Sequence, residues 1–416
     1  MKAGWTTKTI ADVCSVVNGG TPKTGVSEYW DGAHQWITPA EMGKRSTPYV
    51  AKTERSITDA GIQNSSARLL PPLSVILSSR APIGHLVINT EPMATNQGCK
   101  GLVPSDDLNH KYLYYYLSSI VQLLNDLGAG ATFKELSGGK LKEVPIPLPQ
   151  LAEQQRIVAI LDEAFEAIAA ARANADKNRQ NARALFESYL QSVFSQRGEG
   201  WVERKLGDQT LLRMIDGDRG TNYPKATDFL DHGPCLFLNT KNVRPNGFEF
   251  DSTMFISAEK DAQLRKGKLQ RNDVVMTTRG TIGNIGLYSE EVPFDSVRIN
   301  SGMLIFRANQ TEILPAYLFE ILRSGIVKEQ INKYTTGAAQ PQLPIKTLVN
   351  FSIPVPTTLA GQSELVKRIR DFEPETQRLE SLYQSKIAAL DELKQSLLQH
   401  AFSGQLDTTR VEVLTP

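Results

Sequence analysis

The chain has 416 residues, of which 40% are hydrophobic and 22% charged, so it lies in the globular range and has room for several domains. With 46 Lys and Arg against 45 Asp and Glu, the formal net charge is +1, which excludes the strongly basic balance of a non-specific polyanion binder. No apolar stretch approaches the ~20 residues needed to cross a bilayer, and the start, MKAGWTTKTIADV, lacks a signal peptide's apolar core.

The three cysteines, Cys14, Cys99 and Cys235, lie far apart in the sequence. Their spacing matches neither a zinc site nor the dense disulfide framework of a small secreted protein. We therefore expect a soluble chain in a reducing, cytoplasmic environment.

Residues 1–149 are expected to form a first globular αβ domain. Short β-rich runs, such as SVILSS at 74–79, alternate with turns rich in Gly, Pro, Asn and Thr. One helix is expected near 110–126, and the stretch closes with the Pro-rich run VPIPLP at 144–149.

A long helix is expected at 150–197, because no Pro occurs from 151 to 195 and apolar residues recur at alternating steps of four and three. This spacing predicts a heptad seam on a helix ~60 Å long, which would act as a spacer. The seam positions are Ile157, Leu161, Ala164, Ile168, Ala171, Ala175, Asn178, Ala182, Leu185 and Tyr189.

Residues 198–356 repeat the first stretch in order. Gly4-Trp5 matches Gly200-Trp201, and the TTKTIADV that follows the first matches the VERKLGDQ that follows the second. SVILSSRAPIGHLVI matches DVVMTTRGTIGNIGL at 273–287, and Asn96-Gln97-Gly98 matches Asn300-Ser301-Gly302. YLYYYLSS at 112–119 matches YLFEILRS at 317–324, and VPIPLP matches FSIPVP at 351–356. A single such likeness is common among αβ proteins, but six segments in order, with an offset that drifts slowly, indicate two diverged copies of one domain.

A second helix is expected at 357–406, before a tail at 407–416. Its seam repeats the phase of the first at Leu365, Ile369, Phe372, Thr376, Leu379, Tyr383, Lys386, Leu390, Leu393 and Leu397. The polar seam residues Asn178 and Lys386 either fix the register as buried groups or mark a solvated part of the seam. Pro374 is expected to kink the helix or restart it at Glu373.

Together these elements predict an α+β fold with an internal pseudo-twofold repeat. Two similar globular αβ domains are separated by two long α-helices, which pair as an antiparallel coiled coil.

Polar side chains gather in the expected loops of both halves, and such groups can read base edges and bind phosphates. For each of them an ordinary polar loop residue is the simpler alternative, and Arg80 and Arg279 could equally brace a loop. The candidates are Thr21, Lys23, Thr38, Glu41, Lys44, Arg45, Arg80, Asn96, Gln97, Thr132 and Lys134 in the first half, and Arg219, Tyr223, Asn239, Thr240, Lys241, Asn242, Arg244, Arg279, Gln340 and Gln342 in the second.

Catalytic signatures are missing from the sequence. GTIGNIG at 280–286 lacks the dinucleotide-binding spacing, GGK at 138–140 has no Ser or Thr after it, and the five histidines form no close ligand pair. The motif of amino-methyltransferases, Asn or Asp followed by Pro-Pro and an aromatic residue, does not occur. We expect no catalytic residue, metal ligand or cofactor in this chain.

The chain resembles the specificity subunits of type I restriction-modification enzymes over nearly its whole length. The similar segments are NGGTPKT at 18–24, EYW at 28–30, WITPAEM at 36–42, SSRAPIG at 78–84, TNQGCKGL at 95–102, GATFKELS at 130–137 and, most specific, IPLPQLAEQQRIVAILDE at 146–163. The second helix departs from the last pattern, with TTLAGQSELVKRI at 357–369.

The resemblance implies two target recognition domains, 1–149 and 198–356, that each read half of a split, asymmetric DNA site. Helical regions at 150–197 and 357–406 would set the spacer between the half-sites. It also implies two modification subunits that use S-adenosylmethionine to methylate adenine, and motor-nuclease restriction subunits that use ATP and Mg.

Two other classes remain as alternatives. The chain could be a scaffold whose globular halves bind protein, or a methyltransferase or nuclease of unusual sequence.

Overall fold

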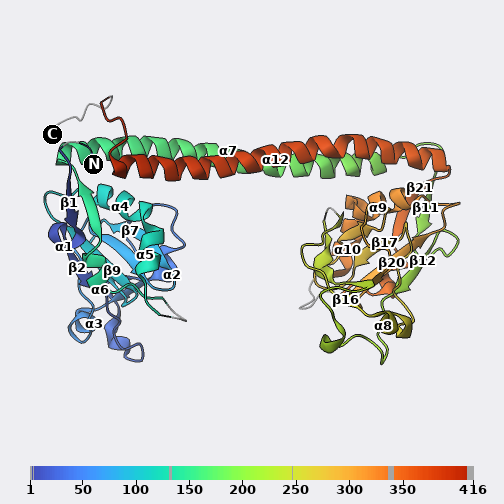
Figure 1. Cartoon of the computed structure of the whole chain (residues 1–416), viewed down its shortest axis with the longest axis horizontal. Helices are drawn as coiled ribbons and strands as arrows, with labels where there is room; N and C mark the ends of the chain where they lie inside the picture. The colour runs from blue at the N-terminus through green and yellow to red at the C-terminus, as the bar shows by residue number, and fades with distance from the viewer. Residues whose placement is uncertain (1, 3, 131–133, 246, 336–341, 410–416) are drawn as a thin grey trace. The chain divides into compact units, whose positions relative to one another are not determined.

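The computed structural model describes residues 2, 4–130, 134–245, 247–335 and 342–409. The chain divides into two compact units, Met1–Ala175 with Ser385–Pro416, and Asp176–Gln384. Each unit contains one αβ domain, blue to cyan and green to orange in Figure 1, together with parts of two 45-residue helices. These helices, α7 (Leu151–Ser195) and α12 (Leu359–Ser403), lie within the two ranges that the sequence predicts to be helical.

The first αβ domain is built from three sheets with short helices between them. The sheets have the strand orders β2-β9-β6-β7-β4, β5-β3-β8 and β1-β10. Its strands are β1 (Thr6–Thr9), β2 (Cys14–Asn18), β3 (Trp30–Ile37), β4 (Tyr49–Val50), β5 (Arg55–Ile57), β6 (Val75–Ser79), β7 (Ile83–Asn89), β8 (Met93–Thr95), β9 (Cys99–Pro104) and β10 (Pro145–Leu148). Its helices are α1 (Ile10–Val13), η1 (Ser27–Tyr29), α2 (Pro39–Met42), α3 (Asp59–Gln63), α4 (His110–Ser119), α5 (Val121–Leu127) and α6 (Gly138–Lys142).

The second αβ domain repeats this plan with the strand orders β12-β20-β17-β18, β16-β13-β19 and β11-β21, to which a short β14-β15 hairpin is added. Its strands are β11 (Trp201–Lys205), β12 (Leu212–Asp216), β13 (Cys235–Leu238), β14 (Val243–Arg244), β15 (Gly247–Phe248), β16 (Phe255–Ile256), β17 (Val274–Thr277), β18 (Ile285–Leu287), β19 (Val297–Ile299), β20 (Met303–Ala308) and β21 (Ser352–Pro356). Its helices are η2 (Ala226–Asp228), η3 (Thr240–Asn242), α8 (Ala258–Gln263), α9 (Pro315–Arg323), α10 (Gly325–Thr335) and α11 (Ile345–Leu348).

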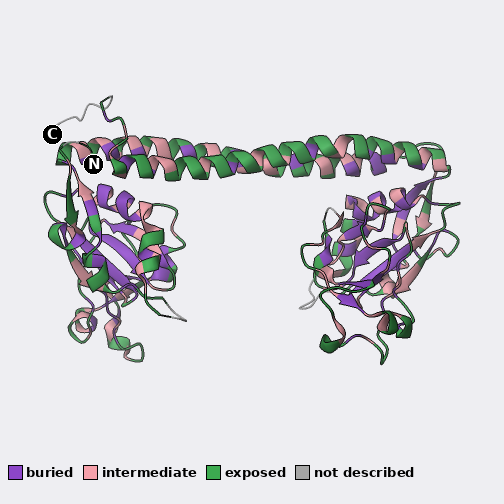
Figure 2. Ribbon diagram, in the orientation of Figure 1, coloured by how far each residue is buried: buried purple, intermediate pink, exposed green. Residues whose placement is uncertain are grey.

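The predicted repeat is confirmed by the shared strand order of the two domains, although β4 of the first sheet has no counterpart in the second. In both domains the middle strand of the three-stranded sheet pairs parallel with one neighbour and antiparallel with the other, as β3 does with β8 and β5 and β13 with β19 and β16. The helix expected near 110–126 is a pair of consecutive helices, α4 with α5, and the second domain has the equivalent pair α9 with α10, near the 315–332 expected for its counterpart. Apolar residues of α4 and α9 are buried between their sheet and the long helices, so most purple ribbon in Figure 2 lies in the sheets and on the helix faces against them.

A buried glutamine joins each domain to the long helix that follows it. Gln154 near the start of α7 accepts from Asn109 N at 2.8 Å and donates to Asp107 O at 2.8 Å and Pro149 O at 2.9 Å. Gln362 in α12 makes the equivalent bonds, from Leu314 N and to two backbone carbonyls. Both side chains are fully buried, so each satisfies three backbone groups that would otherwise lack partners.

The remaining contacts between domain and helix differ in the two units. In the first, Lys111 Nζ lies 2.5 Å from an Asp162 carboxylate oxygen, and the ring of Tyr115 packs edge-on against Phe165 with centroids 5.3 Å apart. In the second, an ion cluster takes this place on α12. Arg323 donates to both oxygens of Glu373, at 2.7 and 2.9 Å, and to Glu320 at 2.6 Å.

The two long helices pair antiparallel within each unit, as predicted. In the second unit Arg183 pairs with Glu380 and the ring of Tyr189 packs on Phe372, so rising numbers in α7 meet falling numbers in α12. In the first unit Arg172 Nε lies 3.1 Å from an Asp391 carboxylate oxygen.

The heptad seam is confirmed only in part. Ile157, Leu161, Ile168, Ala175 and Ala182 are buried as predicted. Leu185, Leu379 and Leu393 were predicted in the seam but are 49%, 40% and 47% exposed, whereas Val366, Ile387 and Leu398, each one position after a predicted seam residue, are buried. The buried stripe drifts because α-helices have ~3.6 residues per turn and because each helix end also packs on a domain.

Two further expectations about the helices are decided by the structure. Asn178 and Lys386 are both exposed, which supports the solvated seam over a buried register pair. The expected restart at Glu373 is wrong, because α12 continues through Pro374 without a break. Within the described residues, no helix is long and apolar enough to cross a membrane.

Candidate nucleic-acid interface

Each domain carries a tight turn where its two larger sheets meet, Asn96–Gly98 between β8 and β9 and Asn300–Gly302 between β19 and β20. The asparagine closes the turn in both, because its Oδ1 accepts from the glycine N, at 2.9 Å in the first domain and 2.8 Å in the second. The first turn contains the candidates Asn96 and Gln97. We refer to these segments as the β8–β9 turn and the β19–β20 turn.

A glycine in the preceding loop packs directly on each turn. A Cβ atom at Gly19 would lie 1.8 Å from Asn96 O, and one at Gly217 would lie 2.3 Å from Asn300 O. Neither distance is sterically possible, so only glycine allows this approach. It brings the loops after β2 and β12, with their candidate residues, onto the two turns.

These loops contact the turns through candidate side chains. Thr21 hydrogen-bonds the Gln97 side chain in the first domain. In the second, Arg219 donates to Ser301 O at 3.3 Å, and the Tyr223 hydroxyl accepts from Ser301 N at 3.5 Å. The structure therefore brings Thr21, Asn96 and Gln97 together, and it gathers Arg219 and Tyr223 at the equivalent place.

Arg80 and Arg279 occupy equivalent positions beside the turns. Arg80 Nη1 lies 3.9 Å from a Glu135 carboxylate oxygen, and residues 80 and 135 form an isolated β-bridge. Arg279 bridges Gln342 in the same way, and the Gln342 oxygen, in the amide orientation that satisfies both residues, accepts from Arg279 Nη2 at 2.9 Å. Both arginines thus brace a loop while staying partly exposed beside the turn.

Two candidates, Glu41 and Asn242, are buried and have their side chains engaged within their own loops. Glu41 is 4% exposed, and its carboxylate accepts from the Arg45 side chain and from Glu54 N at 3.1 Å. Asn242 is 1% exposed and donates to Glu249 O and Ser252 O. Both side chains hold the shape of their loops through these hydrogen bonds.

The other described candidates lie on accessible loops. Thr38 caps α2 and Asn239 caps η3, each with a side-chain oxygen that accepts a backbone N–H. Lys44 pairs with Glu54, Arg244 pairs with Glu249 and Arg45 donates to Lys52 O. Exposed or half-exposed positions are also found for Lys23, Lys134, Thr240 and Lys241, whereas Thr132 and Gln340 lie outside the described residues.

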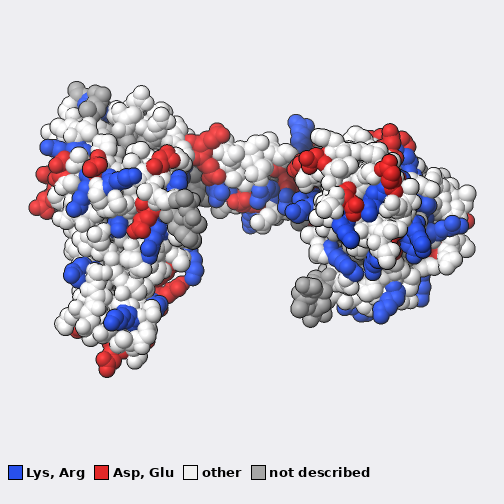
Figure 3. Space-filling view, turned by 60° about the horizontal axis from the view of Figure 1, so that its bottom comes forward, with Lys and Arg blue, Asp and Glu red and all other residues white. Residues whose placement is uncertain are grey.

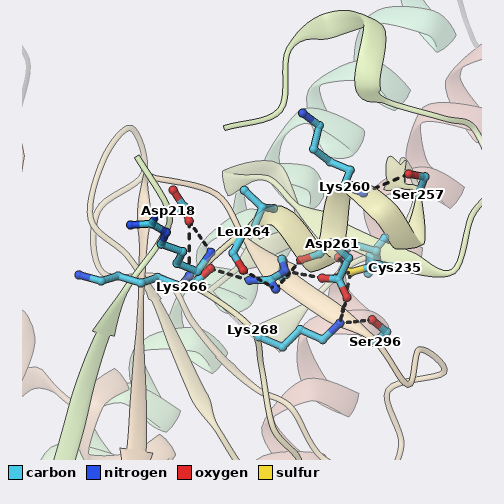
Figure 4. Close-up of polar contacts among 12 residues, drawn as sticks. Asp218, Cys235, Ser257, Lys260, Asp261, Leu264, Lys266, Lys268 and Ser296 are labelled. Atoms are coloured by element: carbon cyan, nitrogen blue, oxygen red, sulfur yellow. Dashed lines mark hydrogen bonds and ion pairs between the residues drawn. The ribbon is translucent and has the colours of Figure 1, made fainter. Parts of the chain in front are cut away.

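A polar network in the second αβ domain, shown in Figure 4, was not predicted from the sequence. Asp261 accepts from Arg298 and from Lys268 Nζ, the latter at 2.5 Å, and Lys268 also donates to Ser296 Oγ at 2.5 Å. The buried thiol of Cys235 lies beside this network, and burial raises its pKa. No motif marks these residues, since they come from four separate segments.

The chain belongs to the family of the type I restriction modification DNA specificity domain, whose model matches residues 2–175 and 198–387. The specificity subunit of the type I restriction enzyme MjaIX from Methanocaldococcus jannaschii is 29% identical over 434 residues, covering 99% of this chain and 94% of the relative. The EcoBI specificity subunit from Escherichia coli is 24% identical and covers 80% of this chain and 74% of its own length.

Solved structures share the fold. One, from work on complex assembly and conformational transition of the type I R-M system, superposes with a TM-score of 0.79 at 17% identity, covering 98% of this chain and 99% of that one. The HsdS subunit from Thermoanaerobacter tengcongensis gives a TM-score of 0.55 at 18% identity, covering 98% of both chains.

Proposed function

We propose that the chain is the DNA specificity subunit of a type I restriction-modification complex and that each αβ domain reads one half of a split site. The observation that carries this proposal is the duplicated turn. Both domains present a polar turn at the same place in the fold, with an arginine beside it and a loop packed on it through glycine. Two similar surfaces with different side chains suit two different half-sites.

The contacting residues in this proposal are the accessible candidates. In the first domain they are Thr21, Lys23, Thr38, Lys44, Arg45, Arg80, Asn96, Gln97, Thr132 and Lys134, and in the second Arg219, Tyr223, Asn239, Thr240, Lys241, Arg244, Arg279, Gln340 and Gln342. Glu41 and Asn242 position their loops.

Catalysis in this proposal belongs to partner subunits in the cytoplasm. Two modification subunits would bind S-adenosylmethionine and dock on the long helices, and restriction subunits would use ATP and Mg. Exposed apolar side chains on α12 support docking there, since Leu379 and Leu382 in the second unit are 40% and 58% exposed and Leu393 in the first is 47% exposed.

The proposal is tested by mapping adenine methylation across the genome of a host that expresses this chain with its modification subunit. The control host expresses the modification subunit alone. A split motif methylated only in the first host is the expected result. Complex formation without chain-dependent methylation would contradict the proposal and favour a scaffold.

A further inference from the structure

In the second αβ domain, the backbone of the loop Leu264–Gly267 is hydrogen-bonded by two charged side chains, Asp218 and Arg298. Asp218 accepts from Arg265 N at 2.8 Å and from Lys266 N at 3.4 Å, and its other oxygen accepts from Gly220 N at 2.7 Å. On the other side, Arg298 donates to Lys266 O at 2.7 Å and Leu264 O at 3.0 Å. Figure 4 shows Leu264 and Lys266 of this loop together with Asp218.

Arg298 is fixed by a second layer of contacts. Its side chain is 8% exposed, and it also donates to Asp261 O at 2.8 Å and to the Asp261 carboxylate. A buried guanidinium is unfavourable unless its donors are satisfied, and here they are used mostly on backbone carbonyls. The backbone N–H of Gly220, the largest of several contributions, lowers the pKa of Asp218, so this carboxylate is charged at neutral pH.

The side chains of the held loop are, by contrast, exposed. Arg265 and Lys266 both lie on the surface, and no described carboxylate forms an ion pair with either. The neighbouring acids are already engaged, Asp216 with Arg219 and Asp261 with Lys268 and Arg298. In Figure 4 the Lys266 side chain extends away from the network, and in Figure 3 basic side chains gather on the lower part of the right-hand unit.

The loop borders the candidate interface. Gly267 O accepts from Ile299 N at 2.9 Å, and Ile299 directly precedes the β19–β20 turn. Asp218 is followed by Arg219, which donates to Ser301 O in that turn. The two exposed cations therefore lie on a rigid segment next to the residues proposed to read DNA.

The first domain lacks this arrangement, although its fold is the same. Ala94 in β8 takes the place of Arg298 in β19, since Ala94 pairs with Trp36 as Arg298 pairs with Phe237. Ala94 is buried in an apolar cluster with Trp30 and Trp36. The fold therefore does not require the charged network, which points to a role particular to the second domain.

We infer that the Leu264–Gly267 loop binds the DNA backbone, with Arg265 and Lys266 each contacting a phosphate beside the second half-site. Asp218 and Arg298 are positioning residues for these contacts. The inference rests on the proposed function and adds a phosphate-binding element to it. A rigid loop suits this task, because a cation that is already in place loses less conformational entropy on binding.

The test measures DNA affinity of the assembled complex at several salt concentrations. Two labelled 40-base-pair duplexes serve as probes, one with the split site found by methylation mapping and one without it. Affinity falls as salt rises, and Arg265→Ala and Lys266→Ala should each reduce the absolute slope of log affinity against log salt by about 0.9, and the double variant by about 1.8, on both probes. The ratio of affinities for the two probes should stay unchanged.

The matched control removes two cations from the same unit that are already paired. In Arg197→Ala with Lys328→Ala, the lost partners are Glu203 at 2.8 Å and Glu187 at 2.9 Å. This double variant should keep the wild-type slope. An unchanged slope in the Arg265 and Lys266 variants, or an equal drop in the control, would overturn the inference. Equal wild-type affinity for the two probes would instead overturn the proposed sequence recognition and leave the slope test valid.

A double-mutant cycle tests the positioning role. Asp218→Asn should reduce the absolute salt slope nearly as much as the loss of both cations does. Adding Asp218→Asn to the Arg265 and Lys266 double variant should reduce it no further. If Asp218→Asn causes a merely structural defect, the triple variant should show a further reduction of the absolute salt slope. An unchanged slope in Asp218→Asn alone would show that Asp218 does not position the loop.

Discussion

Single buried side chains hold the recognition domains on their helices. Replacing Gln154 or Gln362 with alanine leaves two backbone carbonyls and one N–H buried without partners. We expect each variant to lose about 2–4 kcal/mol of unfolding free energy, measured by urea denaturation. Gln155→Ala, at an exposed neighbouring position, is the control and should change stability by less than about 0.5 kcal/mol. A loss no larger than that of the control would contradict the role of these glutamines.

The ion cluster of the second unit makes its stability depend on pH. Burial raises the pKa of Glu320 from 4.5 to about 7, with a smaller contribution in the same direction from Glu373 and opposing contributions from Arg323 and Arg370. The folded state binds the proton more tightly than the unfolded state, so stability falls as pH rises from about 4.5 to about 7.

Glu320→Gln removes this titration and keeps an acceptor for Arg323. The stability of the variant relative to the wild type should increase by about 1–3 kcal/mol between pH 5 and pH 8, as measured by urea denaturation at both values. Glu329→Gln, at an exposed position of α10, serves as control and should show no such change. A difference that is the same at both pH values would rule out the raised pKa.

At the scale of elements, α12 contains an interior proline without ending there. Pro374 cannot donate to the carbonyl four residues earlier, and its ring crowds that turn. Pro374→Ala should therefore raise the unfolding free energy by about 1–3 kcal/mol, with Glu375→Ala, its exposed neighbour, as control in thermal denaturation. If Pro374→Ala lowers stability instead, the local geometry at Pro374 is needed to hold Glu373 against Arg323.

The helices also show what a sequence period can and cannot predict. The two helical ranges and part of the seam followed from the apolar spacing. Leu190 and Leu398 were not predicted in the seam, and each is more deeply buried than the predicted residue before it because it faces a domain as well as the other helix. The spacing of apolar residues along a two-helix seam does not show where a helix also packs against an αβ domain.

At the scale of the whole molecule, the repeat predicted the fold and matched the two segments that form the turns at Asn96 and Asn300. It could not predict the charged network of the second domain, because the first has Ala94 where the second has Arg298. Comparing the sequences of the two domains reveals the features that both contain. Arg298 occurs in only one of them, and its burial depends on partners from distant segments of the chain. The burial of Glu41 and Asn242 was likewise not predictable from the sequence, because it depends on how their loops fold.

Because the two domains share one fold and are each joined to a long helix by an equivalent buried glutamine, either should work in both places once its other helix contacts are restored. A chimera with residues 200–356 in place of 4–148 would carry the second domain twice. Its transplanted Arg323 would meet Asp162 and Phe165 of α7, which form the docking site for Tyr115 and Lys111. Asp162→Arg and Phe165→Glu supply the residues found at the equivalent α12 positions, Arg370 and Glu373, and so rebuild the ion pair.

This chimera should methylate a symmetric site made of two inverted copies of the second half-site, as read by genome-wide adenine-methylation mapping. The same chimera without the two helix substitutions is the control, and it should assemble less well because Arg323 would face Phe165 where it pairs with Glu373 in the second unit. Methylation of the original asymmetric site would refute the assignment of one half-site to each domain. A symmetric motif would establish that sequence recognition resides within each αβ domain and is independent of the helix on which it is mounted.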